Sequence, residues 1–284
     1  MSRTPEPRSL SSNEVARILG VSQVTLRTWE QRYGIGASGR EKNGRRRYLP
    51  GDLDRLRRMR ALQVQGTRAG EAARLVLSRS AAETTVDLRR LRIAESAERL
   101  DLATLGDLVD DALGSLGVAK SWTEVVAPVL RDIGQRWAKA GDRAAMAAEW
   151  ALAAAASAAL DRLRAPAPAR SGRGPVLFVC GPAERHDLPV KMLCAALGDD
   201  GAPAMFLGGL VPLDVLRAVC GRFAPSAVVV WSMTSPSADV RALRTLHAEG
   251  VPVRPAGPGW RGLPACGEPL PSSFVDALAD LHRM

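Results

Sequence analysis

The chain has 284 residues, 46% of them hydrophobic, which is enough for two or three domains of the usual ~100–200 residues each. The net charge of +9 is unevenly distributed, because residues 1–80 contain 17 Lys/Arg and 7 Asp/Glu whereas residues 81–284 contain 22 and 23. This split argues against a uniformly basic protein that binds polyanions loosely, and it predicts a DNA-binding module joined to a control module.

Cysteine spacing and hydropathy exclude further classes. The four cysteines are far apart and form no CxxC pair, which argues against a zinc site and a disulfide framework. The Ala-rich run 144–160 is short for a membrane span and contains Glu149, so a core helix is favoured there. Residues 1–9 have no apolar signal core. We therefore expect a cytoplasmic protein with no membrane partner.

Two short helices with a tight turn between them are predicted near the start. Ser12 can cap the first helix, Gly20 ends it, and Ser22 can cap the second, TLRTWEQRY. In such a pair the second helix enters the DNA major groove. Four polar side chains of the second helix are predicted to face outward, toward DNA: Gln23, Thr25, Arg27 and Arg32.

A basic hairpin follows this helix pair. Asn43-Gly44 is a dipeptide that two-residue hairpin turns prefer, and cations beside a helix-turn-helix can hold phosphates. The hairpin residues expected to do so are Arg45, Arg46 and Arg47. A longer helix is predicted from Asp52, and another short one over 70–78. Residues 1–80 are therefore predicted to be a DNA-binding domain.

The remainder divides into a helical part and an α/β part. Helices are predicted over 86–99, 101–116, 121–139 and 144–163, which indicates a four-helix bundle in residues 86–164. The Pro/Gly/Arg-rich residues 165–174 are typical of a linker. Apolar runs at 176–180, 203–208 and 228–231 alternate with helical patterns, so residues 175–284 are predicted to form a Rossmann-like parallel sheet. In such folds ligands bind at the carboxyl ends of the strands. The loops expected to line a ligand site are therefore 181–188, 208–212, 232–238 and 255–262.

The order of motifs at the N-terminal end resembles the MerR family of transcriptional regulators. The match comprises VARILGVSQVTLRTWEQRYG, the hairpin as wing, and RRYLPGDLDRL. The resemblance implies a winged helix-turn-helix in which Gln23, Thr25 and Arg27 face the groove, Arg45–Arg47 belong to the wing and Tyr48 packs it. It also implies a double-stranded DNA operator, a dimer or tetramer, and RNA polymerase as partners.

The α/β part carries Glu184-Arg185-His186 on a loop at a strand end. A lone His is by default an ordinary loop residue, but a neutral imidazole can ligate a metal, and a nearby carboxylate can orient it. The whole arrangement resembles cobalamin-binding modules, in particular the cobalamin-dependent photoreceptor branch of the MerR family, the CarH and LitR type. That resemblance implies His186 as the cobalt ligand within a Glu-x-His-x-x-Gly motif whose Gly position is Pro189 here.

The resemblance also implies further cobalamin contacts. The matching positions for the nucleotide tail are Ser232, Thr234, Ala256 and Gly257. In the bundle the family has a Trp, nine residues, then Glu-His; this chain has Trp137 and, two residues further than that spacing, Glu149-Trp150. Trp150 replaces the His that in the family serves as second axial ligand after illumination. Pro189 replaces the family's Gly, the residue type that allows the backbone to come closest to a ligand.

Three functions follow as alternatives. The first is a transcriptional regulator whose DNA binding is controlled by a cobalamin-binding-like module. The second keeps the DNA-binding domain but makes the C-terminal module an oligomerisation, docking or other small-molecule unit. The third is a cobalamin enzyme, which the sequence disfavours because no nucleophile-and-base constellation appears and no ~250-residue barrel fits beside the DNA-binding module.

Overall fold

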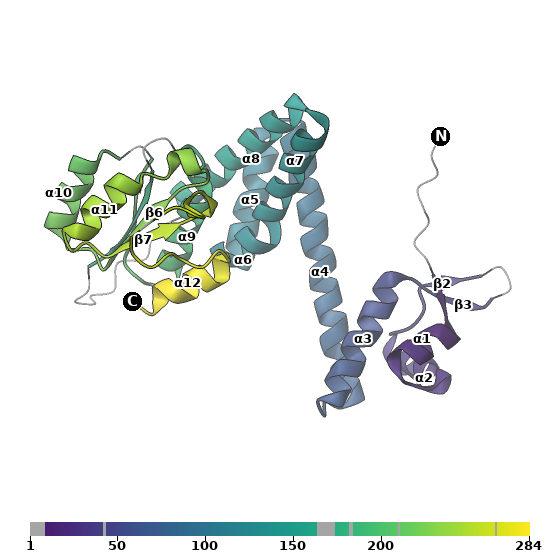
Figure 1. Cartoon of the computed structure of the whole chain (residues 1–284). Helices are drawn as coiled ribbons and strands as arrows, with labels where there is room; N and C mark the ends of the chain where they lie inside the picture. The colour runs from purple at the N-terminus through teal and green to yellow at the C-terminus, as the bar shows by residue number, and fades with distance from the viewer. Residues whose placement is uncertain (1–8, 42–43, 164–173, 182–183, 210, 265) are drawn as a thin grey trace. The chain divides into compact units, whose positions relative to one another are not determined.

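The computed structural model describes residues 9–41, 44–163, 174–181, 184–209, 211–264 and 266–284. It divides into two compact units, Met1–Asp87 and Leu88–Met284 (Figure 1). The predicted linker 165–174 lies almost entirely outside the described residues. No helix in the described ranges combines the length and the apolarity that crossing a bilayer requires.

The first unit begins with the predicted helix pair, α1 (Ser12–Leu19) and α2 (Gln23–Tyr33). Ser11, not Ser12, caps α1, because its hydroxyl accepts the Glu14 N–H while the Glu14 carboxylate accepts the Ser11 N–H at 2.7 Å. This reciprocal capping box satisfies two backbone donors at once, which fixes the start of the helix one residue earlier than predicted. Ser22 caps α2 as predicted, and its hydroxyl accepts the Thr25 N–H at 3.0 Å.

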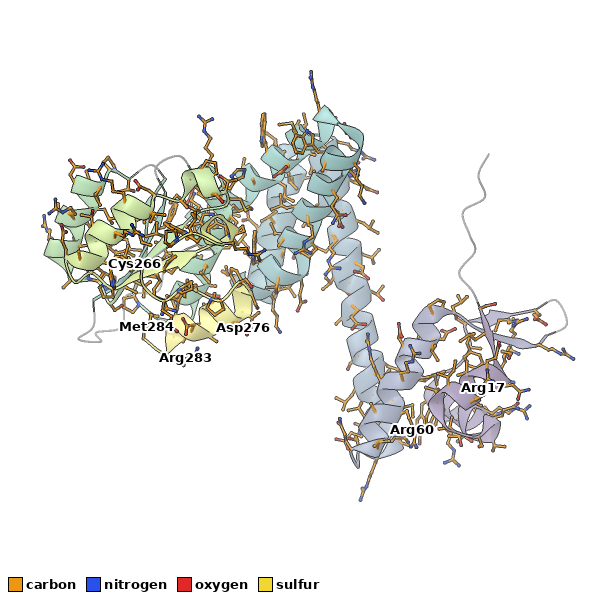
Figure 2. The ribbon with its side chains drawn as sticks, in the orientation of Figure 1. Arg17, Arg60, Cys266, Asp276, Arg283 and Met284 are labelled. Atoms are coloured by element: carbon orange, nitrogen blue, oxygen red, sulfur yellow. The ribbon has the colours of Figure 1, made fainter. Side chains whose placement is uncertain are left out.

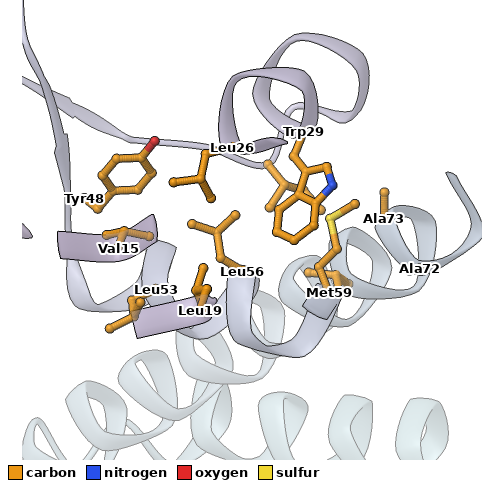
Figure 3. Close-up of a cluster of buried hydrophobic side chains, with 12 residues drawn as sticks. Val15, Leu19, Leu26, Trp29, Tyr48, Leu53, Leu56, Met59, Ala72 and Ala73 are labelled. Atoms are coloured by element: carbon orange, nitrogen blue, oxygen red, sulfur yellow. The ribbon is translucent and has the colours of Figure 1, made fainter. Parts of the chain in front are cut away.

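The core of this unit lies between α1, α2, the wing and the next two helices (Figure 3). Leu26 and Trp29 of α2 face Leu56 and Met59 of α3 (Pro50–Val64), and all four are almost completely buried. The apolar positions recur every three or four residues, so each helix presents one stripe to this core. The opposite face of α2 is thereby left to solvent.

The wing is a three-stranded antiparallel sheet in the order β1-β3-β2, formed by Leu10–Ser11, Arg46–Tyr48 and Gly39–Arg40. The predicted two-residue turn is wrong. The Glu41 N–H donates to the Arg45 carbonyl at 2.8 Å, so three residues separate the paired positions. A three-residue loop needs a left-handed residue at its end, and Gly44 supplies it with φ of 79°. Asn43 lies outside the described residues.

One continuous helix, α4 (Ala69–Glu98), replaces the two helices predicted at 70–78 and 86–99. Its sequence between those segments contains neither Gly nor Pro, so no residue stops the hydrogen-bond ladder. The helix spans the point where the two units divide. Its first turns pack Ala72, Ala73 and Val76 into the core of the first unit, whereas Ile93 and Ala97 are buried in the second.

The bundle consists of the end of α4 with α5 (Leu102–Leu116), α7 (Ala127–Ala140) and α8 (Arg143–Arg162). The helix predicted at 121–139 is interrupted. It starts as the short α6 (Val118–Lys120), continues as the π-helix η1 (Ser121–Val126), and becomes α7 at Pro128 in its first turn. Pro128 lacks the N–H that an interior α-helical position needs, so the regular α-helical hydrogen-bond pattern cannot run through it. The π-helical turns of η1 lie directly before this proline.

The C-terminal part of the second unit is a four-stranded parallel sheet in the order β5-β4-β6-β7. The predicted strands are β4 (Val176–Cys180), β5 (Ala204–Gly208) and β6 (Ala227–Trp231). A fourth, β7 (Val253–Ala256), was not predicted. Its Pro255 disfavours a strand in general, but β7 lies at the sheet edge, where proline is tolerated.

Helices cover both faces of this sheet. On one face α10 (Leu213–Phe223) and α11 (Val240–Ala248) form an apolar cluster with alternate residues of β4 and β6, including Val228 and Val230. On the other, α9 (Leu188–Asp199) packs against β4 and β5, and α12 (Phe274–His282) packs against α9. The strand order reverses between β4 and β6, so the loops after these strands diverge and leave a crevice, the usual ligand position of such sheets.

Candidate functional site

The Glu184 carboxylate links the two loops that flank this crevice. It lies in the loop after β4, is 3% exposed, and accepts hydrogen bonds through both oxygens. Oε1 accepts the Arg185 N–H at 2.9 Å and the His186 N–H at 2.7 Å. Oε2 accepts the Met233 N–H and the Ser237 hydroxyl, both at 2.6 Å, from the loop after β6. Burial alone raises the pKa of Glu184, but these donors outweigh it and lower the pKa to about 2.

This ionised carboxylate determines how His186 presents its ring. Nδ1 of His186 lies 2.7 Å from Oε1 of Glu184. Because an ionised carboxylate can only accept, Nδ1 must carry the proton, and Nε2 of the neutral ring keeps its lone pair. The side chain is 56% exposed, so Nε2 is accessible as a ligand. Asp187 stands at the N-cap position of α9, but its side chain makes no capping hydrogen bond.

The loop after β6 is held against β4 and β7 by buried polar groups. The Ser232 hydroxyl, fully buried, donates to the Ser237 carbonyl at 2.8 Å. Gly257, after β7, has φ of 95°, and a Cβ there would lie 2.4 Å from the Ser232 carbonyl oxygen. Glycine is therefore required for this close approach. The structure thus joins Glu184 and His186 to the loop after β6, where Ser232 lies against Gly257, and it adds Ser237, which no sequence pattern indicates.

A cavity of ≈ 840 Å³ adjoins this crevice. Its wall includes Met233 and Gly257 from the loops after β6 and β7, Pro189 from α9, and Trp122 from the bundle. Pro189 occupies the first turn of α9, so its ring forms part of the wall at the position where the related motif has glycine. The cavity therefore combines residues of the sheet and the bundle, as a site between these two parts requires.

The predicted bundle residues do not line this cavity. Trp137 of α7 is 45% exposed and Trp150 of α8 is 66% exposed, and neither belongs to its wall, nor does Glu149. Trp122 and Arg131, which do belong to it, were not predicted. Thr234 is exposed, and its hydroxyl lies 3.3 Å from that of Ser237. Trp122 lies one predicted helical segment before Trp137. Sequence alone does not distinguish a cavity-lining Trp at that position from a Trp in the core of the bundle.

In the first unit, the outward face of α2 carries two exposed arginines, Arg27 and Arg32. Neither has an ion-pair or hydrogen-bond partner among the residues described here. Gln23 is exposed and hydrogen-bonds through its amide to Asn13 of α1. The Thr25 hydroxyl lies 2.8 Å from that of Ser22. Further positive charge extends beyond α2, with Arg17 on α1 and Arg60 on α3 (Figure 2).

The wing arginines differ from one another. Arg46 donates through Nε to the Glu30 carboxylate of α2 at 2.5 Å, and Arg40 lies 3.6 Å from the same carboxylate. Arg47 donates to Glu41 at 2.6 Å. Tyr48, included among the expected DNA-binding residues, is 1% exposed, so its ring packs in the core and is not available to DNA. Burial raises the pKa of its hydroxyl.

Comparisons with known proteins cover both units. The family described as "MerR HTH family regulatory protein" matches residues 10–78. The "HTH-type transcriptional repressor CarH" of Myxococcus xanthus is 28% identical over 296 residues, 98% of each chain. The repressor CarA of the same organism is 28% identical over 226 residues, covering 78% of this chain and 76% of CarA.

Among solved structures, the Methanosarcina barkeri monomethylamine corrinoid protein matches with a TM-score of 0.50 and 13% identity, over 68% of this chain and 96% of that chain. At this identity the likeness shows the fold alone, and that fold is the bundle and parallel sheet of the second unit. Residues 10–78 therefore match a MerR-type helix-turn-helix domain, the chain as a whole is similar to the CarH and CarA repressors, and its C-terminal part has the fold of the corrinoid protein.

Proposed function

We propose that this regulator binds operator DNA through α2 and the wing, and that cobalamin bound by the second unit controls that affinity. The DNA contacts would be Gln23, Thr25, Arg27, Arg32 and the wing arginines. Because operator symmetry usually mirrors protein symmetry, the binding form would be a homo-oligomer. Catalysis is not part of the proposal, since the repressors to which the chain is similar are regulators.

The observation that carries the proposal is the pairing of Glu184 with His186. A buried, ionised carboxylate held by two loops fixes the tautomer and orientation of an exposed imidazole, and metal-ligating histidines almost always have such a partner. No group of three or more potential ligands occurs among the described side chains. A single imidazole therefore suits a metal that a macrocycle already holds by its other positions, as cobalt is held in a corrin.

Two other features of the second unit support the fit of cobalamin in part. Gly257 leaves room beside the Ser232 carbonyl that a Cβ would fill, and the ≈ 840 Å³ cavity adjoins the same loops. When bound, the group would supply a cobalt ion, and Nε2 of His186 would be the side-chain atom that holds it. The bundle His that the family resemblance implies is Trp150 here, so we propose ligand control without a light-driven exchange of ligands.

The exposed Trp150 and the ring of Pro189 in the cavity wall favour a second candidate. In it, the C-terminal module no longer takes cobalamin and serves in oligomerisation, partner docking or the sensing of another small molecule. The two candidates share the DNA-binding domain and differ only in whether cobalamin changes the visible spectrum and the operator affinity.

The test is a titration of the full-length protein with adenosylcobalamin, followed by its visible spectrum in the dark and after illumination. We expect a bound species whose spectrum changes to the base-off form in His186→Ala, while His247→Ala, an exposed histidine of α11, leaves it unchanged. Operator binding by fluorescence anisotropy, with and without cobalamin, then measures the control. An unaltered cobalamin spectrum after incubation, with no change in operator affinity, would favour the second candidate.

A further inference from the structure

The solvent-facing side of α2 carries an apolar side chain at its centre. Successive residues of an α-helix are turned by about 100° around its axis, so Val24 and Thr28 lie opposite the buried pair Leu26 and Trp29. The Val24 side chain is 69% exposed and stands second in the helix. In helix-turn-helix proteins the N-terminal residues of the second helix contact base edges in the major groove. Val24 therefore occupies a position from which a base can be read.

Neither core packing nor helix stability favours a valine at this position. Val24 does not belong to the buried cluster that Leu26 and Trp29 form with α3. A β-branched residue also favours an α-helix less than the straight-chain residues that suit exposed helical positions. What Val24 supplies is an apolar contact surface, and the molecule that this face of α2 would meet is DNA.

The polar side chains on either side of Val24 already have partners within the helix pair. The side-chain amide of Gln23 donates to Oδ1 of Asn13 on α1. The Thr25 hydroxyl lies 2.8 Å from the Ser22 hydroxyl, which also accepts the Thr25 N–H at 3.0 Å. These contacts tether both polar side chains, and the isopropyl group of Val24 lies between them at the start of α2.

Thr28 extends the apolar surface by one helical turn. Its hydroxyl donates to the Val24 carbonyl at 2.9 Å. Because that hydroxyl is bound to the helix backbone, the methyl group is the part of Thr28 left for contact with a base. Residues four apart on a helix are neighbours on its surface. Val24 and Thr28 thus form an apolar strip, here called the methyl strip, along the outward face of α2.

The chemistry of the major groove identifies what such a strip can recognise. Thymine presents its C5-methyl group there, whereas the other base edges present hydrogen-bond donors and acceptors. We propose that the methyl strip packs on the C5-methyl group of an operator thymine and that Val24 is a specificity-determining residue for that base pair. Any other base at this place would lose water from polar atoms without gaining a hydrogen bond from valine. The inference rests on the proposed function, since it requires α2 to lie in the major groove.

The experiment removes single methyl groups from the DNA. A binding duplex is first selected from a random-sequence pool with the full-length protein, with and without adenosylcobalamin, so that the selection includes whichever form binds. Each thymine is then replaced by deoxyuridine, which lacks only the C5-methyl group, and affinity is measured by fluorescence anisotropy. The variants are Val24→Ala, Arg27→Ala and, as matched control, Val64→Ala, which truncates an equally exposed valine (69%) of α3. Circular dichroism confirms that each variant is folded.

We expect deoxyuridine at a thymine of each half-site to weaken wild-type binding about three- to fivefold, the effect of one buried methyl group. V24A should bind the unmodified duplex more weakly by a similar factor and should not respond to that deoxyuridine. Val64→Ala should respond as the wild type does. At the same position, a 5-methylcytosine·guanine pair should bind more tightly than a cytosine·guanine pair, because it restores the methyl group.

The outcomes separate this inference from the proposed function. If no deoxyuridine weakens binding, or if its effect persists in V24A, the methyl strip does not read thymine. A loss of operator affinity in Arg27→Ala would then still leave α2 as the DNA-binding helix. If no sequence is selected and Arg27→Ala binds duplex DNA as tightly as the wild type, α2 does not contact DNA and both proposals are wrong.

Discussion

The Ser237 hydroxyl donates a hydrogen bond of 2.6 Å to Oε2 of Glu184, across the crevice between the loops after β4 and β6. Both residues are buried, 4% and 3% exposed. Through Oε1 the same carboxylate orients His186 at 2.7 Å. Ser237 is therefore a positioning residue for His186 although it does not touch the ring.

Ser237→Ala should lower cobalamin affinity about three- to tenfold, because one donor to a buried carboxylate is removed and the imidazole is held less firmly. The measurement is a spectral titration with adenosylcobalamin. Ser235→Ala, a change in the same 3-10 helix at an exposed side chain, should have no effect. Equal affinities for the two variants would show that Glu184 holds His186 without Ser237.

Stability of the second unit should decrease in acid because of Glu184. Its pKa is about 2 in the folded chain against the ordinary value of 4.5. The folded-state pKa is the lower one, so the stabilisation is fully present above about pH 4.5 and is lost as the pH falls toward 2. The expected loss is on the order of 3 kcal/mol.

Glu184→Gln should remove this pH dependence and leave a less stable protein at pH 7. Urea unfolding of the wild type and the variant at several pH values between 2 and 7 measures it. Asp187→Asn, an acid three residues later whose side chain makes no capping hydrogen bond, is the control. If the unfolding free energies of the wild type and of E184Q changed with pH in parallel, Glu184 would not be the source of the acid sensitivity.

The sequence predicted those parts of the fold that depend on local pattern. Ser22 as a helix cap and the run VLFVC as a buried strand followed from rules that operate within a few residues. The errors have physical causes of longer range. The edge strand β7 contains Pro255, and only its position in the sheet makes that tolerable. The three-residue turn of the wing depends on how β2 and β3 pair.

The candidate site shows the same limit. Glu184 and His186 were predicted because they share one loop, and their hydrogen bond spans two residues of sequence. Ser237 was not predicted, because its hydrogen bond to Glu184 joins residues 53 positions apart in the chain. No local spacing rule reveals a contact of that range. The exposure of Trp150 likewise depends on which helix face the bundle covers.

The wing should depend on Glu30 for its position. Glu30→Ala removes the carboxylate that holds Arg46 and Arg40 to α2. Charge alone predicts tighter DNA binding, because a negative group is removed from the interface. If DNA binding requires the wing to be held against α2, the affinity of the Glu30→Ala variant for operator instead falls. We expect a decrease of about three- to tenfold, measured by fluorescence anisotropy. Asp54→Ala, an exposed acid on α3, isolates the charge effect, and an increase in both variants would refute the docking role.

Asp52 should be essential to the stability of the first unit. It is 1% exposed, and its Oδ2 accepts the Ser38 N–H, the Ser38 hydroxyl and the Leu49 N–H at 2.7–2.9 Å. Asp52→Ala leaves these donors and Arg55 unpaired, which should cost about 3 kcal/mol of unfolding free energy. Thermal unfolding measures it. A shift as small as that of Asp54→Ala would show that water replaces the carboxylate.

Arg27 and Arg32 should contact phosphates. Both are exposed on α2 and have no partner within the described part of the chain, so no ion pair has to break before DNA binds. Each change to Ala should weaken binding to operator and to unrelated duplex alike. The slope of log affinity against log salt should become less steep by about 0.9 for each phosphate that is no longer neutralised. Arg162→Ala, which removes a cation paired with Asp110 in the bundle, controls for net charge. A weakening confined to operator sequence, with the salt slope unchanged, would instead assign these arginines to base recognition.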